Sequence, residues 1–287
     1  MSDQAPSDQA RPIALVTGSS RGVGAGIARA LGEAGCVVYV TGRSATGHVD
    51  AKMPAGTIED TAEAVTKAGG IGIAVRCDHR DEAQIAALMA RIAKDHRRLD
   101  ILVNNAWGGY ENNAGDGSFA QPFMALPTSF WTDMFEGGLK ATFLTTKHAL
   151  PLMTVPKNAD DGTRLIVNTV AWAYDQYLGN LWYDVVKAAA IRMVQGLSRE
   201  LAGADIAVVA LAPGFVRTER VEKAIGANAE ALAKTESPAY AGRAVAALAG
   251  DPELIEKSGK LLTAGDLARE YSFTDLDGRQ PAAFRFS

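Results

Sequence analysis

The feature that most constrains the fold of this sequence is a short apolar run followed directly by a glycine-rich turn. Ile13–Val16 predicts a buried strand, and residues 17–24, with the sequence TGSSRGVG, follow it. A helix is then predicted from the spacing of Ile27, Ala28 and Leu31. Strand, glycine turn and helix form the setting of a phosphate-binding loop, because glycines let the backbone approach a pyrophosphate and the helix N-terminus faces the anion. The alternative is an ordinary glycine-rich turn, since such patterns also match by chance.

Apolar runs and helical patterns alternate along the chain. Strands are predicted at residues 13–16, 36–41, 71–76, 101–103, 164–169, 205–211 and 260–263. Runs that are apolar on both faces indicate a parallel sheet covered by helices on both sides. The predicted fold class is therefore α/β, a Rossmann-type doubly wound parallel sheet of about seven strands. Its ligand should lie at the carboxyl ends of the strands, where the strand order reverses. The first, second and fourth strands each end there in a polar or glycine-rich cluster.

The 287 residues suffice for one large domain, and no linker, repeat or low-complexity run divides them. We assign residues 1–11 to a disordered tail, because they are polar and lack the apolar core of a signal peptide. Residues 12–287 form a single predicted domain with a C-terminal extension. The net charge of −4 argues against a nucleic-acid partner, and no apolar run is long enough for a membrane span.

Cysteine and histidine usage limits the chemistry that we expect. Cys36 and Cys77, the only cysteines, each flank a predicted strand as buried free thiols, which fits a reducing, cytoplasmic compartment. The four histidines show no close ligand spacing, so no metal site is predicted.

The end of the second predicted strand indicates which dinucleotide the chain would bind. An acidic residue at this place would bind the 2′-hydroxyl of the adenosine ribose, and an arginine would bind a 2′-phosphate. This chain has Arg43 there, and Arg21 in the glycine loop can reach the same region. Both residues predict NADP(H) in preference to NAD(H). The alternative is that both are solvated surface arginines.

Tyr183 and Lys187 are four residues apart and share one face of a predicted helix. An ammonium group beside a phenol favours the phenolate and lowers its pKa from about 10. Tyr183 could therefore donate a proton to a carbonyl oxygen or accept one from an alcohol. Ordinary helix faces also carry Tyr and Lys at this spacing, so the pair alone does not establish a site.

The ordered motifs resemble the short-chain dehydrogenase/reductase (SDR) family along nearly the whole chain. Residues 17–24 are similar to its cofactor loop, and Asn104-Asn105-Ala106 to its structural asparagine motif. Asp78 is similar to its adenine-side acidic residue. Residues 183–187, YDVVK, resemble its catalytic pair, and residues 213–218, PGFVRT, resemble the segment over the nicotinamide.

The resemblance implies hydride transfer between the nicotinamide and a carbonyl or alcohol substrate, with Tyr183 as the acid/base. Lys187 would hold the nicotinamide ribose and tune Tyr183, and Val216 and Thr218 would contact the carboxamide. The chain would form a homodimer or homotetramer. The residues assigned to the cofactor are Gly18, Ser20, Arg21, Gly22, Val23, Gly24, Arg43, Asp78, Asn105, Ala106, Tyr183, Lys187, Pro213, Gly214, Val216 and Thr218.

Two positions depart from the family pattern. The family places a serine about thirteen residues before the tyrosine, where this chain has Val170 and Ala171. It also places an asparagine in the middle helix, where this chain has Gly138. An aliphatic side chain cannot donate a hydrogen bond to a carbonyl oxygen, and the loss of one such donor typically lowers a rate about 10²- to 10³-fold.

Three explanations of the missing donor stay open. A hydroxyl could come from Thr169, Tyr174 or Tyr177. The enzyme could act without the donor on a reactive carbonyl. The chain could also bind the cofactor with weak or no catalysis, as a regulatory or scaffold protein. We favour a reductase, because Tyr183 and Lys187 are retained.

Aromatic residues gather around the predicted site. A long loop at residues 105–127 would form one wall of the substrate pocket. The predicted pocket residues are Trp107, Tyr110, Trp172, Tyr174, Tyr177 and Trp182. Aromatic side chains at this density suit an apolar or ring-bearing substrate, although such clusters also occur in ordinary cores.

Local signals fix several helix ends. Residues 57–67 predict a helix that begins with a capping box. A longer helix is predicted over residues 128–150, with Pro151 disturbing its end. Residues 221–234 predict either a mobile helix over the cleft or a merely exposed one. Ser237 is predicted to cap a helix that has proline at its first position.

Overall fold

The computed structural model describes residues 11–48, 53–109, 120–156, 162–171, 177 and 179–283. In this part of the chain, seven strands form one sheet in the order β3-β2-β1-β4-β5-β6-β7, and all neighbouring strands are parallel. The strands are β1 (Ile13–Val16), β2 (Val37–Gly42), β3 (Ile71–Arg76), β4 (Ile101–Asn104), β5 (Arg164–Thr169), β6 (Ile206–Ala212) and β7 (Leu261–Thr263). The order reverses between β1 and β4, so the predicted doubly wound α/β sheet is confirmed.

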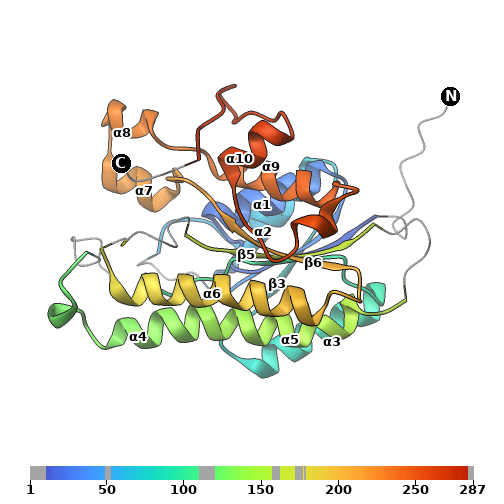
Figure 1. Ribbon diagram of the computed structural model, residues 1–287. Coiled ribbons are helices and arrows are strands. Elements are labelled where there is room, and N and C mark those ends of the chain that lie inside the picture. Colours follow the sequence, from blue (N-terminus) through green and yellow to red (C-terminus); the bar gives the residue numbers. More distant parts are fainter. Residues whose placement is uncertain are drawn as a thin grey trace.

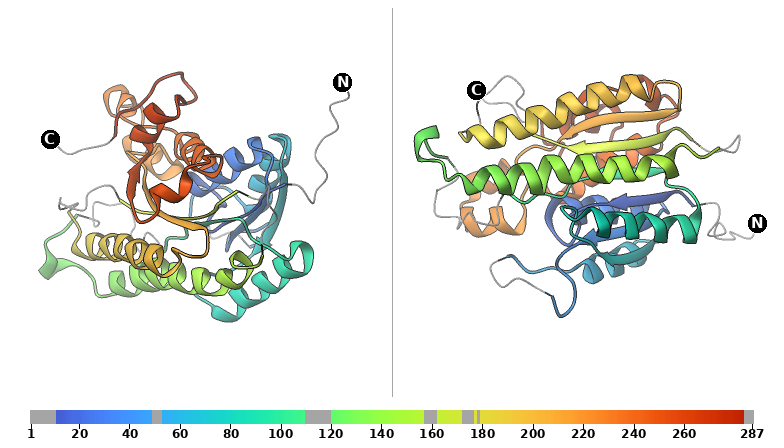
Figure 2. Two further views of the ribbon diagram at one scale, coloured as in Figure 1. Left: turned by 45° about the vertical axis from the view of Figure 1, so that its right-hand side comes forward. Right: turned by 90° about the horizontal axis from the view of Figure 1, so that it is seen from below.

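Helices cover both faces of the sheet (Figures 1 and 2). On one side lie α1 (Gly22–Glu33), α2 (Ile58–Lys67), α9 (Pro238–Ala249) and α10 (Ala264–Glu270). On the other side lie α3 (Glu82–His96), α4 (Ser129–Met134), η3 (Phe135–Lys140), α5 (Ala141–Met153) and α6 (Leu181–Glu200). The segment η3 is a π-helical turn that joins α4 to α5. The short elements are α7 (Glu219–Ile225), α8 (Ala229–Ala233), η2 (Phe123–Ala125) and η4 (Leu254–Lys257).

Two clusters of buried apolar side chains fill the space between the sheet and its helices. Ala14 and Val16 of β1 belong to the cluster beneath α1, α2 and α9. Ile13 and Leu15 point to the opposite face and belong to the cluster beneath α3, α5 and α6. Successive side chains of a strand alternate between its faces, so a central strand with helices on both sides is apolar at every position. This explains the unbroken apolar run before the glycine turn.

The middle helix continues past Pro151, which was predicted to disturb its end. Proline removes one helical hydrogen bond, but the last turn finds partners elsewhere in the fold. The carbonyl of Leu152 accepts a hydrogen bond from the Leu99 amide at 3.1 Å. The carbonyl of Met153 accepts one from the buried Arg164 guanidinium at 2.6 Å. Tertiary contacts therefore stabilise two residues of helix beyond the proline.

Of two other helix predictions, one is confirmed and one is wrong. The capping box is confirmed, because Thr57 and Asp60 exchange both of its hydrogen bonds at the start of α2. The helix predicted over residues 221–234 is instead split into α7 and α8. Gly226 follows α7 with a φ of 55°, a conformation that ends a helix and that glycine adopts without strain.

The segment after β7 packs on α9. Ser237 is the N-cap residue of α9, as predicted, but its hydroxyl donates to the buried carboxylate of Asp275 and makes no capping bond. The Ser237 amide also donates to Asp275, at 2.7 Å. The Tyr240 hydroxyl donates to the carbonyl of Pro281 at 2.9 Å. These contacts join the C-terminal extension to the helix that packs against α1.

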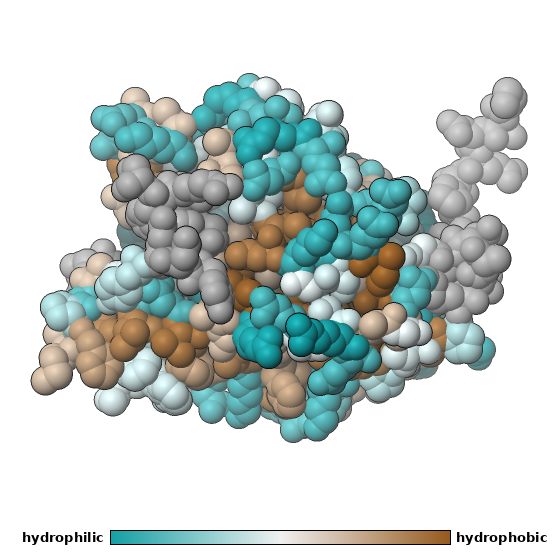
Figure 3. All heavy atoms as spheres, in the orientation of Figure 1, coloured by the Kyte–Doolittle hydropathy of each residue, from teal (hydrophilic) through white to brown (hydrophobic). Residues whose placement is uncertain are grey.

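One part of the outer surface is apolar. Figure 3 shows hydrophobic residues at the lower left, over α4 and the neighbouring part of α6. Large exposed side chains of this region include Phe123, Met124 and Trp131. Trp131 stacks on Phe135 with ring centroids 3.8 Å apart. Aromatic side chains here therefore pack on one another at the edge of the fold.

Candidate active site

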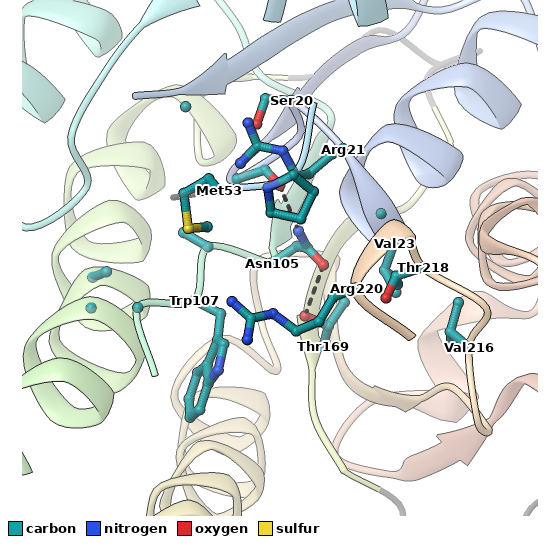
Figure 4. A pocket seen from close by; sticks show the side chains of 18 of the residues that line it. Ser20, Arg21, Val23, Met53, Asn105, Trp107, Thr169, Val216, Thr218 and Arg220 are labelled. Carbon is teal, nitrogen blue, oxygen red and sulfur yellow. Dashed lines mark hydrogen bonds between the residues drawn. The ribbon is translucent and has the colours of Figure 1, made fainter. Parts of the chain in front are cut away.

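A cavity of about 740 Å³ opens at the carboxyl edge of the sheet (Figure 4). The segments that follow β1 to β6 line it, together with α6 and the start of α7. The predicted site residues that line the cavity are Gly18, Ser20, Arg21, Gly22, Val23, Arg43, Asp78, Asn105, Ala106, Trp107, Tyr183, Lys187, Pro213, Gly214, Val216 and Thr218. Residues from distant parts of the sequence thus meet at the edge where the strand order predicts a ligand.

The glycine loop is tied to the end of β4. Gly18 has a φ of 62°, and a Cβ there would stand 2.7 Å from the Ala106 Cα, so only glycine fits. Asn105 Nδ2 donates to the carbonyls of Thr17 at 3.1 Å and Gly18 at 3.0 Å. Gly24 lies behind the loop against the same amide and outside the cavity lining. Asn105 and Gly24 therefore fix the shape of the loop.

The N-terminus of α1 already receives an anionic group. Arg21 is the N-cap residue of α1, and its side chain makes no capping hydrogen bond. The amide of Gly22 donates to Glu219 Oε1 at 3.2 Å. Helix N-termini favour anions through their amides and their dipole. A carboxylate from α7 thus stands where phosphate oxygens would be received, and the residues present fit the pyrophosphate of a dinucleotide.

Arginines gather at the end of the cavity beyond β2 and β3, where Arg21, Arg43 and Arg80 line it. Arg80 pairs with Asp78 at 2.7 Å. Burial alone would raise the pKa of Asp78, but the hydrogen bonds and charge of Arg80, with the charge of Arg43, hold this pKa below its usual value. Arg21 Nη2 donates to the carbonyl of Gly56 at 2.8 Å. The positive charge at this end suits a phosphate group.

Tyr183 and Lys187 lie in the first two turns of α6. Asn180 caps this helix, because its Oδ1 accepts from the Tyr183 amide at 3.0 Å. Lys187 Nζ donates to the carbonyl of Thr169 at 3.4 Å and lies 4.2 Å from the ring centroid of Trp107. Burial lowers the pKa of Lys187 to about 8. The helix thus presents a phenol and an enclosed ammonium group to one cavity.

Thr169, one of the candidates for the hydroxyl donor, lines the cavity. Val170 and Ala171 are buried and line the cavity. The Thr169 hydroxyl donates to the carbonyl of Asn104 at 3.1 Å, so it is used within the sheet edge. Tyr177 is 61% exposed and lies outside the cavity lining.

The predicted aromatic pocket is only partly reproduced. Trp107 lines the cavity, whereas Trp182 packs on Phe123 and Trp131, with ring centroids 5.5 and 5.2 Å away. Trp182 therefore belongs to the apolar cluster at α4 and not to the cavity lining. Three further predicted pocket residues fall outside the described residues: Tyr110, Trp172 and Tyr174.

Three charged residues that line the cavity were missed in the sequence: Arg80, Glu219 and Arg220. Glu219 and Arg220 directly follow Thr218 and line the cavity from the start of α7. Figure 4 shows the Arg220 side chain extending into the cavity, on the side of Trp107. Glu219 and Arg220 could have been identified from the sequence, because they directly follow the PGFVRT segment. That segment ends at Thr218, which lies beside Gly22 of the glycine loop.

A buried carboxyl group lies beneath the 213–218 segment. Glu236 is 3% exposed and accepts a hydrogen bond from the Gly214 amide. Its own amide donates to the carbonyl of Phe215 at 3.0 Å. Burial, together with the charge of Asp275, raises the pKa of Glu236 to about 7. Glu236 therefore couples this wall of the cavity to the C-terminal extension.

Metal and membrane features are absent from the part of the chain that the structure describes. There, no group of three or more histidine, cysteine, aspartate or glutamate side chains is placed to hold a metal ion. No helix within the same ranges has the length and hydropathy that crossing a membrane requires. Cys36 and Cys77 are buried free thiols, as predicted, and burial raises the pKa of each to about 12.

Comparison with known proteins agrees with this geometry. The family model for short chain dehydrogenase matches residues 12–228. Dehydrogenase/reductase SDR family member 1 of Mus musculus is 35% identical over 279 residues, which are 93% of this chain and 84% of the mouse protein. Cis-4-hydroxycyclohexanecarboxylate dehydrogenase of Sinomonas cyclohexanicum is 32% identical over 84% of this chain and 90% of that protein.

Solved structures show the same architecture. The crystal structure of a 3-oxoacyl-(acyl-carrier protein) reductase from Brucella melitensis in complex with NAD superposes with a TM-score of 0.73. It is 27% identical, and the match covers 88% of this chain and 95% of that one.

Proposed function

This chain belongs to the short-chain dehydrogenase/reductase family, and we propose that it is an NADP-dependent oxidoreductase that acts on a carbonyl or alcohol. The observation that carries the proposal is the shared cavity. The glycine loop, the arginines beyond β2 and the Tyr183–Lys187 pair all line it. A nicotinamide cofactor is also bound by the Brucella melitensis neighbour, whose structure contains NAD.

Each group has a role in the proposed reaction. When bound, NADPH supplies the hydride. Tyr183 donates a proton to the carbonyl oxygen in reduction and accepts one from the alcohol in oxidation. The Lys187 ammonium favours the phenolate form of Tyr183 through its positive charge. Gly22 and the N-terminus of α1 receive the pyrophosphate.

The absence of a serine at Val170 or Ala171 narrows the substrates that we expect. A carbonyl bound here would lack the hydrogen bond that this position otherwise donates. We therefore propose activated carbonyls, such as diones and quinones, as the preferred class. The same observation favours the second candidate function, a cofactor-binding protein with weak or no catalysis.

A turnover assay separates these two functions. We expect NADPH oxidation at 340 nm with a reactive dione, and a fall of about 10²-fold or more in Tyr183→Phe with little change in NADPH affinity. NADPH binding without reduction of any aldehyde, ketone or dione would favour the binding-only protein. Equal turnover by Tyr183→Phe would exclude the proposed role of the phenol.

A binding assay tests the choice of NADP. Arg43→Ala is expected to weaken NADPH binding about 10- to 100-fold, the loss of charge-assisted hydrogen bonds to one phosphate. NADH binding should change by less than about twofold, since NADH lacks that phosphate. Arg29→Ala, an equal charge change on the exposed face of α1, is the control. Equal losses for NADH and NADPH would contradict the assignment.

A further inference from the structure

An indole, a phenol and an ammonium group meet in the wall of the cavity. The Trp107 ring lies edge-to-face against Tyr183, with ring centroids 5.4 Å apart and ring planes at 83°. Lys187 Nζ is 4.2 Å from the centroid of Trp107 and 5.5 Å from that of Tyr183. A cation within about 6 Å of an aromatic face is attracted by the ring quadrupole, and tryptophan attracts it best. The indole is thus the nearer aromatic partner of the ammonium group.

The indole fits a slot made by two glycines. A Cβ on Gly138 would lie 2.7 Å from Trp107 Cζ3 and 2.9 Å from its Cε3. A Cβ on Gly109 would lie 2.5 Å from Cζ2 and 2.7 Å from Cε2 of the same ring. These distances are well below van der Waals contact, so any side chain at either position displaces the ring. The π-helical turn η3, which contains Gly138, is therefore shaped around the indole.

Among the described residues, no carboxylate pairs with the ammonium group of Lys187. Within the described ranges it forms no ion pair, and its hydrogen bond to the carbonyl of Thr169 is long, at 3.4 Å. The ionisable groups that line the cavity from the elements around it include Tyr183 on α6 and Glu219 and Arg220 on α7. Glu219 is engaged with the amide of Gly22. Burial is the cause that lowers the pKa of Lys187.

We propose that Trp107 is a positioning residue that holds the Lys187 ammonium in the cavity wall by a cation–π contact. The absence of a side chain at Gly138 leaves the space that the Trp107 ring occupies. The inference rests on the proposed function only for the role of Lys187 beside Tyr183. The contact itself is a property of the protein without cofactor or substrate.

An indole holds an ammonium group in a different way from a carboxylate. A carboxylate would hold the cation strongly, but its negative charge would cancel the field of the ammonium at Tyr183. An indole is neutral overall, so it attracts the cation through its quadrupole and leaves the full positive charge to act on the phenol. The arrangement therefore favours the charged form of Lys187, which burial disfavours, and preserves its effect on the acid/base.

The titration of Lys187 tests the proposal directly. In protein labelled with ¹³Cε-lysine and free of cofactor, the resonance missing from Lys187→Arg identifies Lys187. Trp107→Leu is expected to lower its pKa by about 0.5 to 1 unit, since a partly desolvated cation–π contact contributes that much. Trp107→Phe should lower it less, because a weaker aromatic face remains. Gly138→Ala should shift it in the same direction by moving the indole.

Trp131→Phe is the control, because Trp131 packs on Phe135 and Trp182, away from Lys187, and it should leave the titration unchanged. A role of Trp107 in packing alone would lower the unfolding temperature without moving the Lys187 pKa, and that result would overturn the proposal. A rise of this pKa in Trp107→Leu would overturn it too. If Trp107→Leu does not fold, Trp107→Phe and Gly138→Ala decide the matter. Because no turnover is measured, failure of the proposed reaction would leave this result intact.

Discussion

Replacing Glu219 by glutamine is predicted to tighten NADPH binding about tenfold. The Glu219 carboxylate accepts a hydrogen bond from the Gly22 amide at 3.2 Å, at the place where we propose that the pyrophosphate binds. Glu219 is exposed, so this bond stabilises the cofactor-free protein by only about 1 kcal/mol. Repulsion between one carboxylate and two phosphate charges at roughly 8 Å costs about 1 kcal/mol in a water-like medium. Glutamine keeps an oxygen that can accept from the Gly22 amide, so the substitution removes only the charge-assisted part of this bond. Together with the repulsion, the effect is between about 1 and 2 kcal/mol, or about tenfold in Kd.

Fluorescence titration with NADPH measures this change. The matched control is Glu222→Gln, on the same helix, where the carboxylate pairs with Arg217 at 3.7 Å instead of the glycine loop. Its Kd should stay within about twofold of the wild type. The advantage of Glu219→Gln should shrink in about 0.5 M salt, because screening weakens the repulsion. Equal or weaker binding by Glu219→Gln at low salt would refute the idea that this carboxylate competes with the cofactor.

Two further predictions follow from buried groups. Val170→Ser is expected to raise kcat for an unactivated ketone about tenfold or more by restoring a donor to the carbonyl oxygen, and steady-state kinetics with Ala171→Ser as the comparison would identify the position. The raised pKa of Glu236, about 7, means that the folded protein binds its proton more tightly than the unfolded chain. Stability from this group is therefore present below about pH 4.5 and is lost as the pH rises towards 7. Glu236→Gln should be more stable than the wild type by about 3 kcal/mol at pH 8, from a pKa raised by about 2.5 units at about 1.4 kcal/mol each, and nearly equally stable at pH 4.5, as measured by urea unfolding. A difference that does not depend on pH would contradict this account.

Local signals in the sequence predicted most of the fold correctly. The run Ile13–Val16 is buried on both faces, as parallel strands between helices are. The Thr57 capping box formed as predicted because its partners lie within one helical turn. The prediction that Pro151 disturbs the end of the middle helix was wrong, because the contacts that decide it are not local. The groups that stabilise the helix around it come from Leu99 and Arg164, which are remote in sequence.

In the candidate site, too, some residues could be placed from the sequence and others could not. The strand order alone predicts that residues 17–24 and Asn105 meet at one edge, and the structure brings them together. Which aromatic side chains face the cavity could not be predicted, because it depends on packing between helices. Trp182 turns towards α4, whereas Trp107 turns towards Lys187. Trp107 depends on the space that Gly138 leaves for its ring, and that space is visible only in three dimensions.

The two departures from the family pattern differ in kind. At Gly138, the lost side chain is replaced by the Trp107 ring, so the space is filled and Lys187 gains a partner. At Val170, an aliphatic side chain lines the cavity, and the neighbouring Thr169 hydroxyl is bonded to Asn104. In the proposed reaction, the first change preserves the charge beside Tyr183, whereas the second removes a donor to the substrate. We therefore expect the proposed active site to retain its means of moving a proton but to stabilise a developing oxyanion less. Its rate should therefore depend on how electrophilic the substrate carbonyl already is, which is why we expect diones to be reduced and simple ketones to react slowly.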